Sequence, residues 1–545
     1  MSADRPRAWC RPLPASFLLL AAYAVLSLFM SPGGYLGTDT GAKVATLDVM
    51  HERGTARPVL GYWAEDLDPT GELHPIYDAA LIEGDWVHVT SLPMLQLARP
   101  LWALGGYRLT LILPMLGALG SAWAARVLAR RVAGEQIGWQ AFWFVGLGSP
   151  IAVYALDFWE HAPGVACIVG AVALLAAVVD GERAIVRTVA AGALFGLAAT
   201  MRTEAFVYTL VAVGVACLTV AVRQRSIMQA MRIGLLSVVG FAGPWLANSL
   251  LESAVGGTDR GGRAAGAAGG GFDRLGDRGR EAVITLLALR STDFLEALLL
   301  GGLAAALAAA AVVVDRRGDS RRAVALLLGS ALLHLVATAA GIGFVPGLLA
   351  AAPVAVAGLV VLPSNASGRY AWVVAIVALP LVWSFQYLGG AQPQWGDRYA
   401  LATGAMLATL GLVALAGCSR HVRVGLVSLA VLVTGSGVVW LQERSHSFER
   451  LFDQLVERPE DVIVSRNGFF LREGGDAYSE RLWLTAVTDN DLDFAVQVIQ
   501  DSQHDSFAVL DQAPEAPTAL DDATLVETTE LRVVGVSVYL HSYSL

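Results

Sequence analysis

The sequence predicts a polytopic α-helical membrane protein with about thirteen transmembrane helices, a long first outer loop and a small C-terminal α/β domain. The 545 residues are 55% hydrophobic and only 16% charged, with a mean hydropathy of +0.56. This composition is too apolar for a soluble globular protein. The apolar residues also fall into segments of the roughly 17 to 25 residues that a bilayer requires, whereas residues 442–545 are hydrophilic.

Thirteen apolar segments can be placed along the chain. They cover residues 13–31, 107–128, 138–156, 162–179, 187–203, 206–222, 233–251, 294–314, 323–341, 345–362, 371–388, 399–417 and 424–441. No small-x-small cleavage site follows the first segment, so it is expected to remain as a span. Arginines at the N-terminus and in alternate connections share one side, which the positive-inside rule makes cytoplasmic. The tail from residue 442 is therefore expected outside.

Two outer loops of the predicted transmembrane domain, residues 1–441, are long. The first, residues 32–95, carries ten acidic residues and aromatic residues that suit an interface. The second, residues 252–293, is rich in glycine and contains six arginines. We expect it to be flexible in the free protein and to order over a bound donor as a lid.

Residues 442–545 are expected to form a separate acidic domain. They contain twenty acidic residues and seven arginines. Strand-like runs at 461–465, 506–510 and 531–539 alternate with a helical pattern at 492–499. This order predicts a small extracytoplasmic α/β domain.

Asp39 is the first candidate catalytic residue, because it lies just beyond the end of the first apolar segment. Gly37 and Gly41 bracket it and permit a tight turn close to a ligand. Lys43, the only lysine of the chain, follows one helical turn later. The alternative is that Asp39 caps the helix that follows.

A second group of candidates occupies a short outer turn between two predicted spans. Asp157 and Glu160 lie one helical turn apart and His161 follows directly. They could act as metal ligands, contacts to an acceptor hydroxyl or an acid pair. The alternative is an ordinary helix start with Pro163 in its first turn.

Two arginines at membrane depth are candidate phosphate ligands. Arg202 could bind a phosphate that Glu204 helps to position, or the two could simply neutralise each other. Arg398, beside Tyr399, offers a forked set of donors that suits a phosphate. The alternative for this second pair is an anchor in the interfacial aromatic belt.

These short motifs resemble those of the GT-C class of integral-membrane glycosyltransferases, which includes protein O-mannosyltransferases and the aminoarabinose transferases of lipid A. The points of similarity are the first-loop motif 37–43, the approach to the second span at 93–106 and the acidic turn 157–161. To these add Arg202-Thr-Glu204, where members often have Arg-Pro-Glu, and 394–399, similar to a bacterial Gln-Trp-Gly-Pro-Arg-Tyr motif. Thr203 and Asp397 replace the usual prolines.

The resemblance implies a bacterial enzyme of the cytoplasmic (inner) membrane. It would transfer a sugar, with inversion, from a polyprenyl-phosphate donor to a glycan, lipid or protein acceptor at the outer face. In that class the acidic residue of the first outer loop, here Asp39, is the general base on the acceptor. The leaving phosphate needs fixed cations, for which Lys43, Arg202 and Arg398 are candidates.

Some alternatives stay open at this stage. A divalent metal could be held by the oxygens of Asp39, Asp157 and Glu160. A transporter or flippase for a lipid-linked or polar substrate is a second class, but the sequence lacks a matched pair of interrupted segments in its two halves. A noncatalytic envelope scaffold is a third. No nucleic-acid partner is expected.

Overall fold

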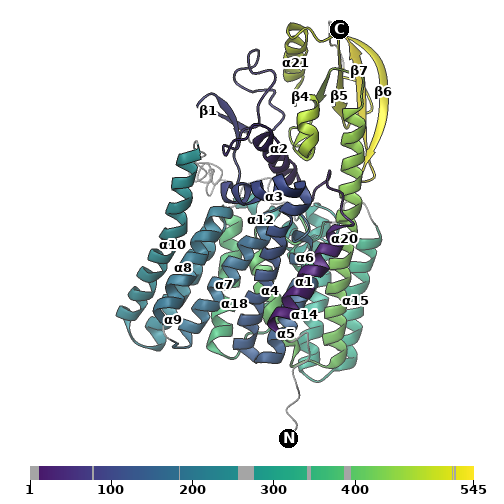
Figure 1. Cartoon of the computed structure of the whole chain (residues 1–545). Coiled ribbons are helices and arrows are strands. Elements are labelled where there is room, and N and C mark those ends of the chain that lie inside the picture. The colour runs from purple at the N-terminus through teal and green to yellow at the C-terminus, as the bar shows by residue number, and fades with distance from the viewer. Residues whose placement is uncertain are drawn as a thin grey trace.

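A computed structural model describes residues 11–76, 79–182, 184–255, 275–340, 345–385, 394–517, 520 and 523–545. Its lower part is a bundle of helices, and the rest rises from one end of that bundle (Figure 1). The bundle contains α1 (Pro12–Ser27), α4 (Ile112–Ala133), α5 (Glu135–Leu147), α6 (Ile151–Tyr154), α7 (His161–Val179), α8 (Ala184–Met201), α9 (Ala205–Arg223), α10 (Ile227–Val255), α13 (Phe294–Glu296), the π-helical η3 (Ala297–Gly301), α14 (Gly302–Arg316), α15 (Ser320–Ala339), α16 (Leu348–Ala351), α17 (Pro353–Val360), α18 (Ala366–Phe385), α19 (Leu401–Leu415) and α20 (Arg420–Val456).

The chain is a polytopic membrane protein, as the sequence predicts. Eight helices within the described ranges are long and apolar enough to cross a membrane, and three more are apolar but shorter. The predicted spans 138–156 and 345–362 are each divided into two helices, α5 with α6 and α16 with α17. Pro150 and Pro353 lie at these divisions, where proline disfavours a continuous helix.

Close backbone contact between helices depends on small residues. A Cβ atom on Gly192 or Gly196 of α8 would lie 2.2 or 2.3 Å from a carbonyl oxygen of α10, and one on Gly240 of α10 would lie 2.1 Å from the Val189 oxygen of α8. Only glycine permits these approaches. Small residues allow such van der Waals contact, which drives helix association in a membrane.

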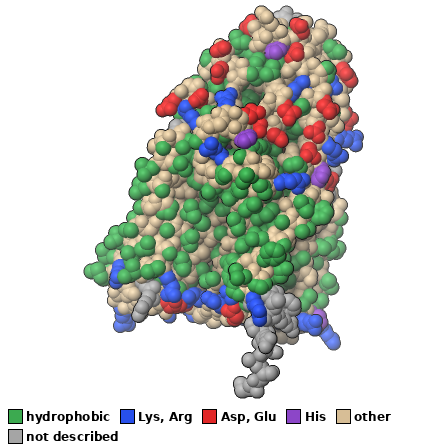
Figure 2. All heavy atoms as spheres, viewed as in Figure 1, with side chains coloured by type: hydrophobic (Ala, Val, Ile, Leu, Met, Phe, Trp, Pro, Cys, Tyr) green, Lys and Arg blue, Asp and Glu red, His purple; other side chains and the backbone are tan. Residues whose placement is uncertain are grey.

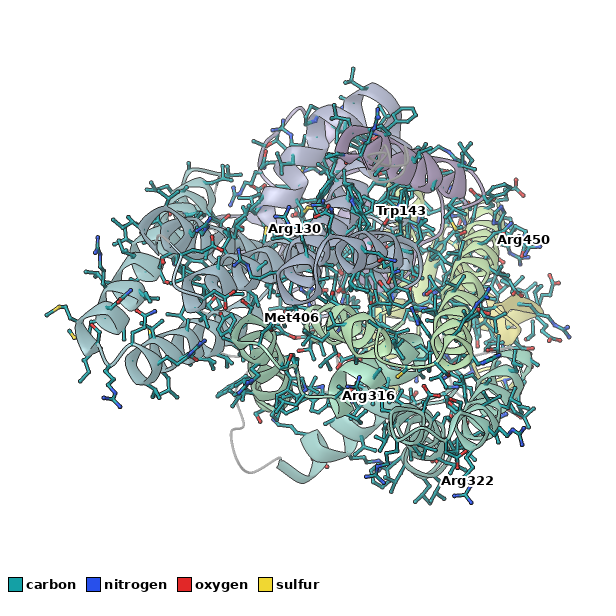
Figure 3. The ribbon with its side chains drawn as sticks, turned by 90° about the horizontal axis from the view of Figure 1, so that it is seen from below. Arg130, Trp143, Arg316, Arg322, Met406 and Arg450 are labelled. Atoms are coloured by element: carbon teal, nitrogen blue, oxygen red, sulfur yellow. The ribbon has the colours of Figure 1, made fainter. Side chains whose placement is uncertain are left out.

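Charged residues gather at the two ends of the molecule. Hydrophobic side chains cover most of the lower part, while acidic and basic side chains cluster over the upper part and along the bottom edge (Figure 2). Arg130, Arg316 and Arg322 are seen when the bundle is viewed from below (Figure 3). The first outer region and the C-terminal domain both lie at the opposite end (Figure 1).

The first outer region is built from two helices and a hairpin. They are α2 (Thr38–Glu52), β1 (Ala79–Ile82), β2 (Asp85–His88) and α3 (Leu92–Thr110), with β1 and β2 antiparallel. Gly106 of α3 has φ +60 and marks a kink in that helix, a conformation that favours glycine.

The second long loop of the sequence prediction, residues 252–293, contains a helix in its described part. Residues 256–274, which hold most of its glycines, lie outside the described residues. The following segment is α12 (Leu275–Leu287), a helix with a polar and an apolar side. Around the end of this helix, Ile284 and Ala288 pack with Ala297 in a small apolar cluster. The flexibility of the loop in the free protein stays a prediction.

The C-terminal domain contains a five-stranded sheet and a helix. The elements are β3 (Val462–Ser465), the short helices η4 (Leu471–Glu473) and η5 (Gly475–Glu480), β4 (Leu482–Thr485), α21 (Asp489–Asp501), β5 (Ser506–Asp511), β6 (Thr524–Val533) and β7 (Val536–Ser544). The strand order is β4-β3-β5-β7-β6, with β4, β3 and β5 parallel.

One predicted strand of this domain is two strands in the structure. The apolar run 531–539 is interrupted by Val534 and Gly535, with φ values of 48° and 74°. Two consecutive left-handed residues are typical of a tight hairpin turn. The run therefore reverses direction and forms the end of β6 and the start of β7.

Candidate active site

Asp157 holds the start of α2 in place. Its carboxylate accepts hydrogen bonds from the Leu36 backbone at 3.0 Å, the Thr40 hydroxyl at 2.5 Å and the Tyr107 hydroxyl at 3.2 Å. The helix begins at Thr38 after Gly37, and no side chain caps it. Asp39 is therefore in the first turn of the helix but is not its cap, which removes the alternative role considered for it.

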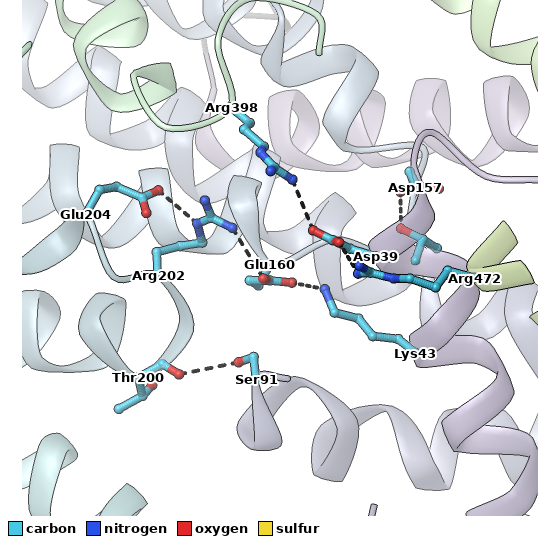
Figure 4. A network of polar contacts seen from close by, with 11 residues as sticks. Asp39, Lys43, Ser91, Asp157, Glu160, Thr200, Arg202, Glu204, Arg398 and Arg472 are labelled. Atoms are coloured by element: carbon cyan, nitrogen blue, oxygen red, sulfur yellow. Dashed lines mark hydrogen bonds and ion pairs between the residues drawn. The ribbon is translucent and has the colours of Figure 1, made fainter. Parts of the chain in front are cut away.

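Asp39 is bound by two arginines from distant parts of the chain (Figure 4). Arg398 donates to its Oδ2 at 3.1 Å, and Arg472 of η4 donates to its Oδ1. The C-terminal domain reaches the site because α2 carries Gly41, where a Cβ atom would lie 2.1 Å from the Arg472 carbonyl oxygen. Gly41 thus allows the close approach of the two domains.

A second chain of ion pairs runs beside Asp39 (Figure 4). Lys43 pairs with Glu160, and Arg202 contacts the other oxygen of Glu160 at 3.4 Å. Arg202 also donates through Nε to Glu204 at 2.8 Å. All four side chains are buried, so each charge depends on its partners.

Arg398 is presented by an unusual turn. Gln394, Trp395, Gly396 and Asp397 all have positive φ, a conformation that costs free energy for residues other than glycine. Trp395 is fully buried, and Asp397 accepts a hydrogen bond from the Trp383 indole at 3.0 Å. These contacts hold the turn in its strained form and fix the start of the Arg398 side chain.

Tyr399 lies between the two arginines of the membrane part. Its ring centroid is 4.8 Å from the Arg398 guanidinium and 5.2 Å from that of Arg202. These distances are typical of cation–π contacts. The aromatic ring separates two like charges and orients both.

The pKa values of the site follow from burial and from these charges. Burial alone would raise the pKa of Asp39, but the guanidinium groups of Arg472 and Arg398 outweigh it and hold this pKa well below its usual range. Burial lowers the pKa of His88 to about 3, and Arg472 acts in the same direction. Burial raises the pKa of Asp157 to about 6 against its hydrogen bonds. Asp39 is therefore a carboxylate at neutral pH.

A cavity of about 160 Å³ opens beside Asp39. Its lining residues are Asp39, Lys43, His88, Val89, Thr90, Glu160, Arg202, Thr203, Tyr399 and Arg472. The charged groups around it, with Arg398 and Glu204 included, are four cations and three carboxylates. The cavity is thus suited to a small anionic group.

Most of the predicted site residues lie at or beside the cavity. Asp39, Lys43, Glu160, Arg202 and Tyr399 all line the cavity, and Arg398 binds Asp39. Glu204 stands behind Arg202, and Asp157 positions α2. His161 does not line the cavity: its ring packs 4.4 Å from that of Trp159 and 5.2 Å from that of Tyr154. The structure therefore places His161 behind the cavity wall that Glu160 forms, and its contact with a substrate stays a prediction.

Two ionisable residues that line the cavity, His88 and Arg472, were not predicted. His88 is buried and shares a hydrogen bond with the Thr46 hydroxyl at 2.9 Å. Arg472 lies 433 positions after Asp39, and nothing in the sequence distinguishes it from the other arginines of the tail. Only the folded structure brings it to α2.

The three carboxylates considered as metal ligands do not form one cluster. Asp39 is engaged by two arginines, Glu160 by Lys43 and Arg202, and Asp157 by hydrogen-bond donors. Across the described ranges, no group of three or more His, Cys, Asp or Glu side chains could hold a metal ion. The residues therefore do not fit the divalent site that the sequence left open.

Comparison with known proteins gives matches only to solved structures. No protein-family model and no curated protein matches the chain. The structure is similar to AglB, an oligosaccharyltransferase from Archaeoglobus fulgidus in complex with an inhibitory peptide and a dolichol-phosphate. That match has a TM-score of 0.48 and 12% identity, and it covers 91% of this chain and 69% of AglB.

The structure is also similar to ArnT from Cupriavidus metallidurans. The match to the apo state has a TM-score of 0.44 and 15% identity, and it covers 96% of this chain and 97% of ArnT. The form bound to undecaprenyl phosphate matches with a TM-score of 0.42 and 14% identity, over 97% of this chain and 98% of ArnT.

Proposed function

We propose that the protein transfers a sugar from a polyprenyl-phosphate donor to an acceptor at the outer face of the bacterial cytoplasmic membrane. The observation that carries this proposal is a cavity beside Asp39 at which four cations outnumber three carboxylates. The cations are Lys43, Arg202, Arg398 and Arg472, and the carboxylates are Asp39, Glu160 and Glu204. A buried excess of cations calls for an anion, and guanidinium groups suit phosphate oxygens. A lipid phosphate would reach this site from the bilayer.

In the donor-free protein Asp39 forms ion pairs with Arg398 and Arg472, the two arginines that a phosphate would bind. We propose that the donor phosphate takes over Arg398 and Arg472 and so releases Asp39. The pKa of Asp39 then rises toward its ordinary range, since the charges that lower it are neutralised. A carboxylate freed in this way is a better proton acceptor than one held in two ion pairs.

The transfer step is then a displacement at the anomeric carbon. The acceptor hydroxyl gives its proton to Asp39 while its oxygen bonds to the anomeric carbon from the face opposite the phosphate. The bond from that carbon to the phosphate oxygen breaks, and its electron pair stays on the phosphate. Arg202, Arg398 and Arg472 stabilise the charge that develops there. The configuration at the anomeric carbon is therefore inverted.

The site favours an enzyme over the two alternatives. A scaffold would not need buried charges, which are costly at membrane depth unless paired. A flippase would need an aqueous path between the two faces, whereas α2, which carries Asp39 and Lys43, lies at one end of the bundle (Figure 1). The C-terminal domain, which supplies Arg472, is on this account extracytoplasmic.

Replacement of Asp39 by Asn tests the assignment. The variant keeps the shape of the side chain but cannot accept the proton, so turnover should fall by about 10²- to 10⁴-fold while undecaprenyl phosphate still binds. Asp48→Asn on the same helix is the matched control, because Asp48 accepts a hydrogen bond from Ser479 at 2.9 Å and does not line the cavity. Equal turnover of the Asp39 variant and the parent would refute the role.

A further inference from the structure

A crevice of about 600 Å³ lies in the C-terminal domain. This volume is larger than that of the cavity at Asp39 and falls in the range typical of small-molecule sites. The segments that form it follow the ends of β3, β4 and β5, and β7 contributes Val538 to its floor. The crevice is therefore at the carboxyl edge of the three parallel strands.

The order of the strands explains why a crevice forms there. From β3 the chain passes to β4 on one side, while from β5 it passes to β6 at the opposite edge of the sheet. The loops after β3 and β5 thus leave in opposite directions. Ligands of open α/β sheets bind at this kind of switch point, outside the carboxyl ends of the strands.

The lining has the chemistry that recognises carbohydrate. Phe469 and Val487 are 49% and 52% exposed at the crevice and offer an apolar surface for the C–H face of a sugar ring. Asn467, Gln512 and Asp511 add amide and carboxylate groups. Sugar hydroxyls both donate and accept hydrogen bonds, as this mixture requires.

The crevice carries little uncompensated charge. Arg466 donates to Asp489 at 2.7 Å and to the Thr488 carbonyl at 2.8 Å, and its Nε lies 3.9 Å from Asp511. Its charge is thus already neutralised by carboxylates. A neutral glycan suits this surface better than a phosphate or another anion.

The crevice is bordered by Phe469, three residues before Arg472 of the proposed active site. The Phe469 ring that borders it lies 5.8 Å from the guanidinium of Arg472, and Arg472 binds Asp39. Phe470, the next residue, packs 5.5 Å from Phe452 of α20. A chain of sugar residues seated in the crevice could therefore extend to Asp39 along this segment.

We propose that the crevice binds a neutral oligosaccharide, the acceptor end of a glycan, and holds it for transfer at Asp39. This inference rests on the proposed function only for its last step, since binding is a property of the C-terminal domain. The crevice lies in the part of the molecule that rises from the bundle (Figure 1). An acceptor glycan reaches it from water, whereas the lipid donor reaches Asp39 from the bilayer.

The test is carbohydrate binding by the full-length protein in nanodiscs. Short neutral oligosaccharides of mannose, galactose, glucose or arabinose are the probes, and saturation-transfer difference NMR is the measurement. Val487→Trp fills the mouth of the crevice. Val526→Trp is the matched control, because Val526 is 67% exposed on the edge strand β6 and does not line the crevice.

We expect at least one oligosaccharide to bind the parent and the control variant, and its affinity to fall about tenfold or more, at least about 1.4 kcal/mol, in Val487→Trp. Retained binding of undecaprenyl phosphate will show that this variant is folded. The inference is overturned if no oligosaccharide binds, if Val487→Trp binds as well as the control, or if unstructured peptides bind the crevice instead. Loss of oligosaccharide binding with intact donor binding would leave the proposed function standing.

Discussion

Replacement of Arg472 by Gln should shift the pH dependence of the reaction. Among the charges that lower the pKa of Asp39, Arg472 makes the largest contribution and Arg398 the second largest. Two unit charges about 4 Å apart interact by about 4 kcal/mol at an effective dielectric constant of about 20. The Asp39 side chain is 30% exposed, so solvent reduces this value, and an adjacent arginine typically lowers a carboxyl pKa by about 1 to 3 units.

We therefore expect the acid limb of kcat/KM, which reports the free enzyme, to move up by about one pH unit or more in Arg472→Gln. The sign follows from the lowered pKa: the parent keeps Asp39 ionised until the pH falls well below the ordinary range, whereas the variant protonates it earlier. The pairing also stabilises the folded protein at neutral pH, and this stabilisation is lost as the pH falls through the lowered pKa.

The assay is sugar transfer by purified protein in nanodiscs, with lipid-linked sugars and envelope glycans extracted from the parent cells. Arg532→Gln is the control, because Arg532 is exposed on β6, where it pairs with Glu530. An acid limb that stays in place in Arg472→Gln would show that Arg472 does not set the ionisation of the catalytic group. Asp39 would then not be that group, or its pairing would differ in solution.

Three further outcomes are expected. Arg398→Ala should weaken undecaprenyl phosphate binding by about tenfold to a hundredfold, because charge-assisted hydrogen bonds contribute about 1.5 to 3 kcal/mol; unchanged affinity in a titration would exclude the phosphate contact. Glu160→Gln leaves Lys43 buried without a full charge partner and should lower the free energy of unfolding by about 3 kcal/mol or more. Glu182→Gln at the surface should lower it by under about 1 kcal/mol, and equal melting temperatures of the two variants would contradict this. Impermeant thiol reagents should label Val526→Cys but not Arg321→Cys in intact cells of a cysteine-free background, and labelling of Arg321→Cys would overturn the predicted orientation.

The hydrophobic segments could be predicted because the length of a span is fixed by the bilayer. The breaks at Pro150 and Pro353 fall inside continuous apolar runs, so hydropathy alone does not reveal them. Likewise, the turn at Val534 and Gly535 lies within an apolar run whose strand propensity is high throughout. Local preference describes each residue, but the left-handed backbone there is set by the pairing of β6 with β7.

The candidate site could be predicted only where its charges stand out in an apolar sequence. Asp39, Glu160, Arg202 and Arg398 are conspicuous because charge is rare near a span. Arg472 is one arginine among several in a hydrophilic tail, and its role depends on a contact that Gly41 permits across the whole length of the chain. His161 is the opposite of Arg472 in this respect: its ionisable side chain is conspicuous in the sequence, but its ring packs among aromatic rings in the structure.

Mass spectrometry of the envelope glycans and lipid-linked sugars of a deletion strain shows whether the protein transfers a sugar from a polyprenyl-phosphate donor. Complementation with the parent gene and with Asp39→Asn separates catalysis from the presence of the protein. Our account predicts that the deletion strain and the Asp39→Asn strain both lose one glycan product and accumulate one polyprenyl-phosphate sugar, and that the parent gene restores both to normal. Unchanged glycans and lipid-linked sugars in the deletion strain, or full restoration by Asp39→Asn, would contradict it.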